Sequence, residues 1–215
     1  MIEEKVEIKL QKAYSIRDIE TKKFQSIRLA DDFQKLIGKP ELCGSWIIFG
    51  DSGNGKTRFA LELAKSLARF KKVAYNSLEE GISLSLSKAI KEINFSKVQG
   101  NFQLLQQESI QQLEERLKRQ RSPQVVIIDS LQFSGLDKLS YKALTKRYAK
   151  KLFIFISHAE GKLPQGSTAK AVRYDSNVKV FVKGYKAFAV SRYGGGTPYI
   201  IWHDGAEKYW NKPEK

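Results

Sequence analysis

Short apolar runs alternate along the chain with stretches in which apolar residues recur every three or four positions. A continuous apolar run predicts a buried strand, whereas the wider spacing predicts an amphipathic helix. The clearest predicted strand is Gln124 to Ile128, in which every residue from Val125 onward is β-branched. Such a run is typical of a strand covered on both faces, so we expect it at the centre of a sheet. Other strands are predicted at 45–49, 73–77, 102–105 and 152–156.

Helices are predicted between these strands, and the character of the chain then changes. Helical spacing covers residues 57–70, 83–93, 109–121 and 138–150. From about 160 to 175 the chain is polar and contains glycine, which indicates a flexible loop. Three late strands joined by tight turns are predicted at 178–182, 187–193 and 199–202. The pattern predicts an α/β fold with a mainly parallel, doubly wound sheet and an antiparallel hairpin extension at its C-terminal edge.

Length and composition favour one domain. The chain has 215 residues, of which 41% are hydrophobic, enough for a single sizeable core. Residues 1–40 are mixed and charged, which predicts an arm or helix packing on a main domain at 41–215. The single cysteine, Cys43, fits a packing role and excludes an internal disulfide, as expected in a reducing compartment. Without a secretory signal or an apolar membrane span, we expect a soluble, cytoplasmic protein.

The chain is strongly basic. It has 38 Lys and Arg against 23 Asp and Glu, a formal net charge of +15. This balance favours an anionic partner, nucleic acid before an acidic membrane surface. Lysines at 138, 142, 146 and 150 recur at helical spacing, although a solvated helix face is the commoner explanation of such a pattern.

A glycine-rich motif connects the first predicted strand to the first predicted helix. It has a glycine, four variable residues and then Gly-Lys-Thr, the pattern of a P-loop. Its glycines allow backbone N–H groups to wrap phosphate oxygens at the positive end of the helix. We expect Lys56 to reach the β- and γ-phosphates of ATP and the Thr57 hydroxyl to bind Mg²⁺. The motif comprises Gly50, Asp51, Ser52, Gly53, Asn54, Gly55, Lys56 and Thr57.

Carboxylates follow two of the predicted strands. Asp129 ends the most apolar strand, at the sheet edge where ligands of such folds bind, and is the candidate Mg²⁺ ligand opposite the P-loop. The next residue is Ser130, so the adjacent-glutamate arrangement of many ATPases is excluded. Glu79 follows another strand, which we expect one strand over from the P-loop. It is the preferred catalytic base, Glu80 competes with it, and either acid could simply favour a helix start.

Three further features bear on function. His158 follows a central strand, where it could sense the γ-phosphate or be an ordinary surface histidine. The loop that follows is basic and could bind DNA phosphates. Arg192 lies at the end of a late strand and before a glycine turn, where it could project toward a neighbouring subunit. The expected DNA-binding residues of the loop are Lys162, Lys170 and Arg173.

The order of these motifs resembles the RecA-type ATPases, most closely the core shared by the RadA and DnaB groups of recombination and replicative helicase proteins. The resemblance covers about residues 45–204. It rests on the P-loop, on Ser77 to Glu80, on Ile127 to Gln132, on Ser157-His158 and on Ser191 to Gly194. A core without further domains is the kind expected in a phage or mobile element.

The resemblance implies a RecA-like fold and a role for each motif. Glu79 would activate water, His158 would occupy the sensor position, and residues 162–173 would face DNA. It also implies a homo-oligomer, a ring or filament, in which Arg192 enters the neighbour's ATP site as an arginine finger. One departure is Val190, since members often carry lysine two residues before the finger.

Three functions compete. The leading hypothesis is a DNA-dependent, oligomeric ATPase acting in recombination or replication on single- or double-stranded DNA. The second is an ATP-dependent assembly or loader module without helicase activity. The third is a P-loop kinase, which the sequence disfavours because no arginine-rich lid is found between the helices.

Overall fold

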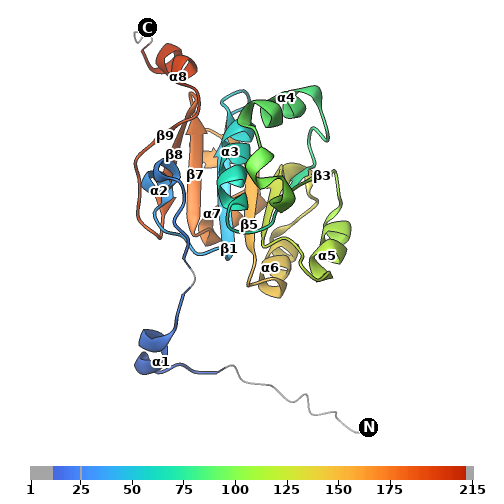
Figure 1. Cartoon of the computed structure of the whole chain (residues 1–215), viewed down its shortest axis with the longest axis vertical. Coiled ribbons are helices and arrows are strands. Elements are labelled where there is room, and N and C mark those ends of the chain that lie inside the picture. Colours follow the sequence, from blue (N-terminus) through green and yellow to red (C-terminus); the bar gives the residue numbers. More distant parts are fainter. Residues whose placement is uncertain (1–11, 25, 212–215) are drawn as a thin grey trace.

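One sheet organises the chain (Figure 1), and its strands have the order β3-β2-β4-β5-β1-β7-β8-β9. The structure is a computed structural model that describes residues 12–24 and 26–211. Strands β3 to β7 of that order are parallel, and β8 and β9 are antiparallel, which confirms the predicted fold class. The strands are β1 (Gly44–Gly50), β2 (Val73–Ser77), β3 (Phe102–Gln106), β4 (Val125–Asp129), β5 (Leu152–Glu160), β7 (Val178–Lys183), β8 (Lys186–Ser191) and β9 (Tyr199–Ile200). A short strand, β6 (Leu163–Pro164), pairs with the end of β5.

Strand β4 lies at the centre because both of its faces are covered. Val125 and Ile127 belong to one hydrophobic core, and Val126 and Ile128 belong to the other. All four side chains are fully buried. Alternate residues of a strand point to opposite faces, so the continuous apolar run supplies both cores at once.

Helices cover the two faces of the sheet. One core includes residues of α2 (Asp31–Ile37), α3 (Lys56–Ala68) and α4 (Leu84–Ile93). The other includes residues of α5 (Ile110–Lys118), α6 (Lys138–Arg147) and α7 (Ser167–Asp175). Two 3₁₀ helices, η1 (Ser96–Asn101) and η2 (Leu131–Phe133), lie in connections, and α8 (His203–Trp210) ends the described chain. None of the described helices is long and apolar enough to cross a membrane.

Helix α7 corrects the expectation of a flexible loop up to residue 175. Gly166, with φ +87°, turns the chain immediately before the helix. Ala169 and Val172 lie one helical turn apart, and both are buried in the core. The polar residues around them masked this spacing in the sequence. Helix α8 was not predicted at all.

Helix α6 is shorter than the predicted helix. It ends at Arg147, and Tyr148 leaves the helical region with φ −110° and ψ 41°. The ammonium of Lys151 donates to the carbonyl of Pro123 at 2.7 Å as the chain turns into β5. The exposed basic face of this helix therefore contains Lys138, Lys142 and Lys146 but not Lys150.

The N-terminal segment contains two helices with different burial. Helix α1 (Ile16–Thr21) has no buried residue and lies away from the sheet in Figure 1. Helix α2 buries Phe33, whose ring stacks on Tyr199 at 4.7 Å and approaches Phe59 of α3 at 5.9 Å. Residues 1–11 lie outside the described part, and the division of the chain at residue 40 stays a prediction.

The carbonyl end of α2 is bound by the turn that follows β8. The amides of Gly196 and Thr197 donate to the carbonyls of Leu36 and Lys35 at 2.9 and 3.1 Å. The Ser191 hydroxyl donates to the carbonyl of Ile37 at 2.8 Å. These bonds satisfy backbone acceptors that a helix end leaves free.

Candidate nucleotide-binding site

The P-loop motif joins β1 to α3, as the sequence predicts. Gly50 ends β1 and Lys56 begins α3. Gly55 precedes the helix in the left-handed region, with φ +93°, and no side chain caps the helix start. The first N–H groups of this 13-residue helix are therefore available to an anion at its positive end.

Lys56 lies folded over the loop. Its ammonium donates to the carbonyl of Asp51 at 2.8 Å. Burial lowers the pKa of Lys56, and the charges of Asp129 and Glu79 oppose that shift. A partly desolvated ammonium facing two acids is well suited to bind the oxygens of a polyphosphate, because the phosphates would supply further negative charge.

The acids opposite the P-loop come from β4 and β2. Asp129 ends β4 and pairs in register with Ser77 of β2 on one side and Ile156 of β5 on the other. Glu79 lies two residues beyond Ser77, and its amide donates to the carbonyl of Asp129 at 3.1 Å. The strand order corrects one expectation: β5 and β4 lie between β2 and β1, so Glu79 follows the strand beside Asp129 and not the one beside the P-loop.

Asp129 occupies an unfavourable place for an ionised carboxyl. Burial raises its pKa to about 6, and the nearby charges of Glu79 and Glu80 act in the same direction. A hydrogen bond from the Tyr75 hydroxyl to Oδ2 and the positive charge of Lys56 act in the opposite direction. A carboxylate in this position would gain strongly from a bound cation.

Glu79 and Glu80 differ in their partners. Oε2 of Glu79 lies 3.2 Å from Nε2 of His158. Glu80 accepts hydrogen bonds from Ser83 at 3.0 Å and Ser85 at 3.1 Å, at the start of α4. Glu80 thus supports the helix start, which was the alternative for both acids, whereas Glu79 faces His158 across the site.

His158 connects the site to neighbouring loops. Its amide donates to Oε1 of Gln132 at 3.4 Å, and its carbonyl accepts from the amide of Gln165 at 2.9 Å. The Gln132 side chain also donates to the Ser157 hydroxyl at 2.8 Å and to the carbonyl of Gln165 at 3.2 Å. A continuous hydrogen-bond network therefore joins the end of β5 to η2 and to the start of α7.

One cavity of about 270 Å³ brings the central candidates together. Lys56, Thr57, Glu79, Asp129 and His158 all line it. The buried hydroxyl of Ser130 lines it too, and Oγ has no hydrogen-bond partner among the described residues. The glycine turn, the uncapped helix start, the acids and this orphaned hydroxyl fit the phosphates of ATP with Mg²⁺, for which Thr57 and Asp129 would be the protein ligands.

Tyr185 is a residue of the cavity that sequence reasoning missed. It lies in the turn between β7 and β8 with φ +60° and lines the same cavity. The turn is fixed to the P-loop, because the amide of Gly184 donates to Oδ1 of Asn54 at 2.7 Å. The two partners are 130 positions apart, so no local pattern announces the contact. Arg58 also lines the cavity, but it pairs with Glu62 and Glu92.

Arg192 lies far from this cavity. Strand β8 is antiparallel to β7, and its end at Ser191 pairs with Val178 at the start of β7. Arg192 is therefore exposed at the sheet edge opposite the P-loop. Lys186 begins β8 and lies at the P-loop edge, about 20 Å away along the strand. At that distance from Arg192, Lys186 cannot take the place of the lysine that the resemblance would put at position 190, where this chain has valine.

Two of the three expected DNA-binding residues lie together. Lys162, in the turn between β5 and β6, and Arg173, on α7, line a second hollow of about 620 Å³ that also contains Asp51 of the P-loop. Lys170 is exposed elsewhere on α7, where its ammonium lies 3.7 Å from the carboxylate of Glu160.

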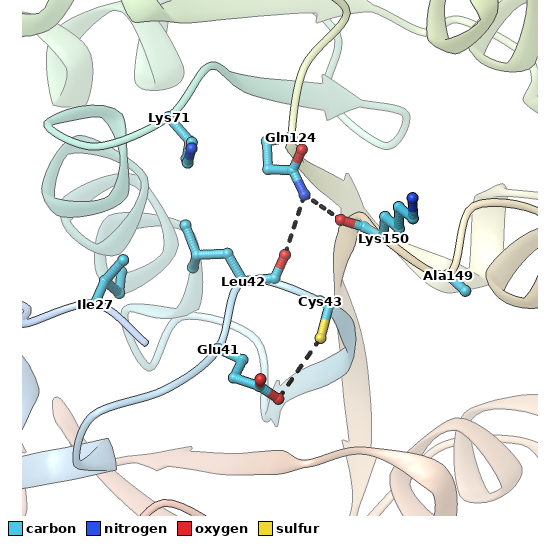
Figure 2. Close-up of a pocket in the computed structure, with 8 residues that line it drawn as sticks. All are labelled: Ile27, Glu41, Leu42, Cys43, Lys71, Gln124, Ala149 and Lys150. Atoms are coloured by element: carbon cyan, nitrogen blue, oxygen red, sulfur yellow. Dashed lines mark hydrogen bonds between the residues drawn. The ribbon is translucent and has the colours of Figure 1, made fainter. Parts of the chain in front are cut away.

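A further hollow lies at the opposite edge of the sheet (Figure 2) and has a volume of about 410 Å³. The amide nitrogen of Gln124 donates to the carbonyls of Leu42 and Lys150, and the Cys43 thiol lies 3.9 Å from the Glu41 carboxylate. Burial raises the pKa of Cys43, and Glu41 adds to the shift. A raised pKa leaves less of the thiol ionised at neutral pH, and the polar groups of Gln124 and Cys43 find their hydrogen-bond partners within the lining of the same hollow.

Together, the sheet order and the P-loop cavity define a RecA-like α/β fold. The flagellar accessory protein FlaH from Methanocaldococcus jannaschii is similar with a TM-score of 0.59 and 19% identity, over 82% of this chain and 94% of FlaH. The KaiC-like protein PH0186 from the hyperthermophile Pyrococcus horikoshii OT3 is similar with a TM-score of 0.56 and 17% identity, over 77% of this chain and 88% of the other. No protein-family model and no curated protein matches the sequence.

Replacing Asp129 with Asn should stabilise the nucleotide-free protein at high pH. Because the folded-state pKa is raised from 3.8 to about 6, the carboxyl stabilises the fold when protonated, and this contribution is lost as pH rises through about 6. We expect Asp129→Asn to melt above the wild type at pH 8, by roughly 2–4 °C per kcal/mol relieved, with a smaller gap at pH 5. Differential scanning calorimetry without nucleotide measures this.

The matched control is Asp32→Asn, since the Asp32 side chain is 75% exposed. Its melting temperature should stay near that of the wild type at both values of pH. If Asp129→Asn melts below the wild type at pH 8, the ionised carboxyl stabilises the fold, and the raised pKa of Asp129 is wrong.

Proposed function

We propose that the chain is a RecA-type ATPase that hydrolyses ATP with Mg²⁺, assembles as a homo-oligomer and acts on DNA in recombination or replication. The observation that carries the hydrolytic part is the convergence of Lys56, Thr57, Asp129 and Glu79 on one cavity. A cytoplasmic location belongs to the same proposal and fits the single cysteine.

The residues of the cavity have distinct roles in this proposal. The helix start and Lys56 bind the phosphates, and Thr57 and Asp129 hold Mg²⁺, which neutralises charge on the β- and γ-phosphates when bound. Glu79 orients the attacking water and accepts its proton. His158, 3.2 Å from Glu79, positions that carboxylate and passes the state of the site to Gln132 and Gln165.

Glu79→Gln should abolish hydrolysis and leave nucleotide binding intact, because the amide keeps the shape of the side chain but accepts no proton. We expect the turnover number to fall by roughly 10²–10⁴-fold, measured as free phosphate released. A fluorescent ATP analogue should bind with an affinity close to that of the wild type.

Glu80→Gln is the matched control, since this acid bonds Ser83 and Ser85. It should lower turnover only slightly. A large loss with Glu80→Gln and none with Glu79→Gln would exchange the two roles. If the wild type binds ATP and releases no phosphate, alone or with DNA, the hypothesis of an ATP-dependent loader module is correct and that of an ATPase is wrong.

The position of Arg192 supports a shared site. An exposed arginine at the edge opposite its own P-loop can reach ATP only in another subunit. A head-to-tail interface of this kind places one surface of each subunit against a different surface of the next, as in rings and filaments. Arg192 would then neutralise charge that develops as the γ-phosphate departs.

Mixing two inactive variants tests the shared site. Arg192→Ala keeps the P-loop, and Lys56→Ala keeps the arginine, so each lacks a different half. Alone, both should hydrolyse ATP near background. Mixed in equal amounts, they should recover roughly a quarter of wild-type turnover, because about that share of interfaces joins two intact halves. Turnover that remains at background in mixtures shown by light scattering to co-assemble would contradict an arginine acting in trans.

A further inference from the structure

Three phenylalanines form a ladder across the sheet on one of its faces. Phe49 of β1 pairs in register with Phe181 of β7, and Phe181 pairs with Phe188 of β8. The rings of Phe49 and Phe181 lie 5.3 Å apart. Trp210 of α8 extends the row, with its ring 5.9 Å from that of Phe188. We refer to these four residues as the aromatic ladder.

Basic side chains lie on both sides of the ladder. Residues two positions along a strand share its face, so Lys183 and Lys186 flank the ladder at one end and Lys179 at the other. The Lys186 ammonium lies 5.4 Å from the centre of the Trp210 ring. The Arg173 guanidinium lies 5.9 Å from the centre of the Phe49 ring. Nε of Arg173 is buried and has no hydrogen-bond partner among the described residues.

This face is open. It forms the hollow of about 620 Å³ that contains Lys162 and Arg173. Val190, which neighbours the ladder on β8, is 70% exposed, and Trp210 is 41% exposed. Among the described residues that line the hollow, Asp51 is the one acid, against Lys162, Arg173, Lys179 and Lys183. The hollow therefore presents aromatic rings and positive charges together. A basic surface that only binds water has no need of exposed aromatic rings.

We propose that single-stranded nucleic acid binds across β7 and β8, with its bases on Phe181, Phe188 and Trp210 of the ladder and its phosphates on the flanking lysines and Arg173. Stacking requires an unpaired base face, whereas a duplex keeps its faces inside its own stack. The proposal rests on the DNA-dependent function above, and it names the surface and the strand form that this function would use.

The surface is connected to the ATP site through backbone contacts. Asp51 lines the hollow, and its carbonyl accepts the hydrogen bond from Lys56. Strands β7 and β8 meet in the turn whose Gly184 amide donates to Asn54 of the P-loop. A strand bound across β7 and β8 thus contacts both strands of the turn that supports the P-loop, which is a physical route for stimulation of hydrolysis.

Fluorescence anisotropy with labelled oligo-dT, oligo-rU and a blunt DNA hairpin tests the proposal. The wild type should bind both single strands more tightly than the duplex, and the two single strands distinguish DNA from RNA. The double variant Phe181→Ala and Phe188→Ala should lose roughly 10- to 100-fold in affinity for the single strands. It should keep its basal turnover and lose stimulation by oligo-dT. Phe188→Tyr alone, which retains a stacking ring, should bind like the wild type.

Charge is tested separately. Lys179→Gln with Lys183→Gln should reduce the slope of log affinity against log salt by roughly 0.7 for each lysine. Lys138→Gln with Lys142→Gln removes the same charge from the exposed face of α6 and should leave the slope unchanged. Circular dichroism checks that every variant is folded.

Two results would overturn the proposal. One is unchanged oligonucleotide affinity in the folded phenylalanine variant, and the other is tighter binding of the hairpin than of the single strands. If the phenylalanine variant keeps its oligonucleotide affinity but changes its oligomeric state in light scattering, this face is a contact between copies of the chain. If the wild type does not hydrolyse ATP, the proposed ATPase function is wrong, but the result for binding of single strands is unaffected.

Discussion

Parallel pairing of the central strands is the constraint on which the rest of the structure depends. Because β2, β4, β5 and β1 run in one direction, the residues that follow them meet at one edge of the sheet. Side chains from four separate parts of the sequence thereby share one small cavity. Both faces of these strands are buried, so their register cannot slip without exposing apolar residues. The rigid core thus fixes the distances among groups that would otherwise repel.

Features that depend on local pattern could be predicted from the sequence. The β-branched run of β4 identified a central strand, and the glycine-rich motif identified the turn into α3. Helix α7 escaped prediction because two buried apolar positions, Ala169 and Val172, carry its packing within a polar segment. The pattern there was too weak for a periodicity argument, and burial against the sheet decided the structure.

Contacts between distant residues could not be predicted. Strand order is decided by how helices pack across the sheet. The sequence alone placed the strand before Glu79 next to the P-loop strand, whereas β4 and β5 lie between them. The contact between Gly184 and Asn54, and with it the place of Tyr185, depends on where β7 lies. The aromatic ladder needs the register of three strands, of which β1 and β7 are separated by more than a hundred residues. Individually, its phenylalanines have the pattern of ordinary core residues.

Helix α2 joins two parts of the fold that lie far apart in the sequence. One end of it is bonded to the turn that carries Arg192, through the carbonyls of Lys35, Leu36 and Ile37. Its Phe33 ring is wedged against Tyr199 and against Phe59 of the P-loop helix. The helix therefore couples the position of the turn that carries Arg192 to that of the helix that begins at the P-loop, so neither can move without displacing α2.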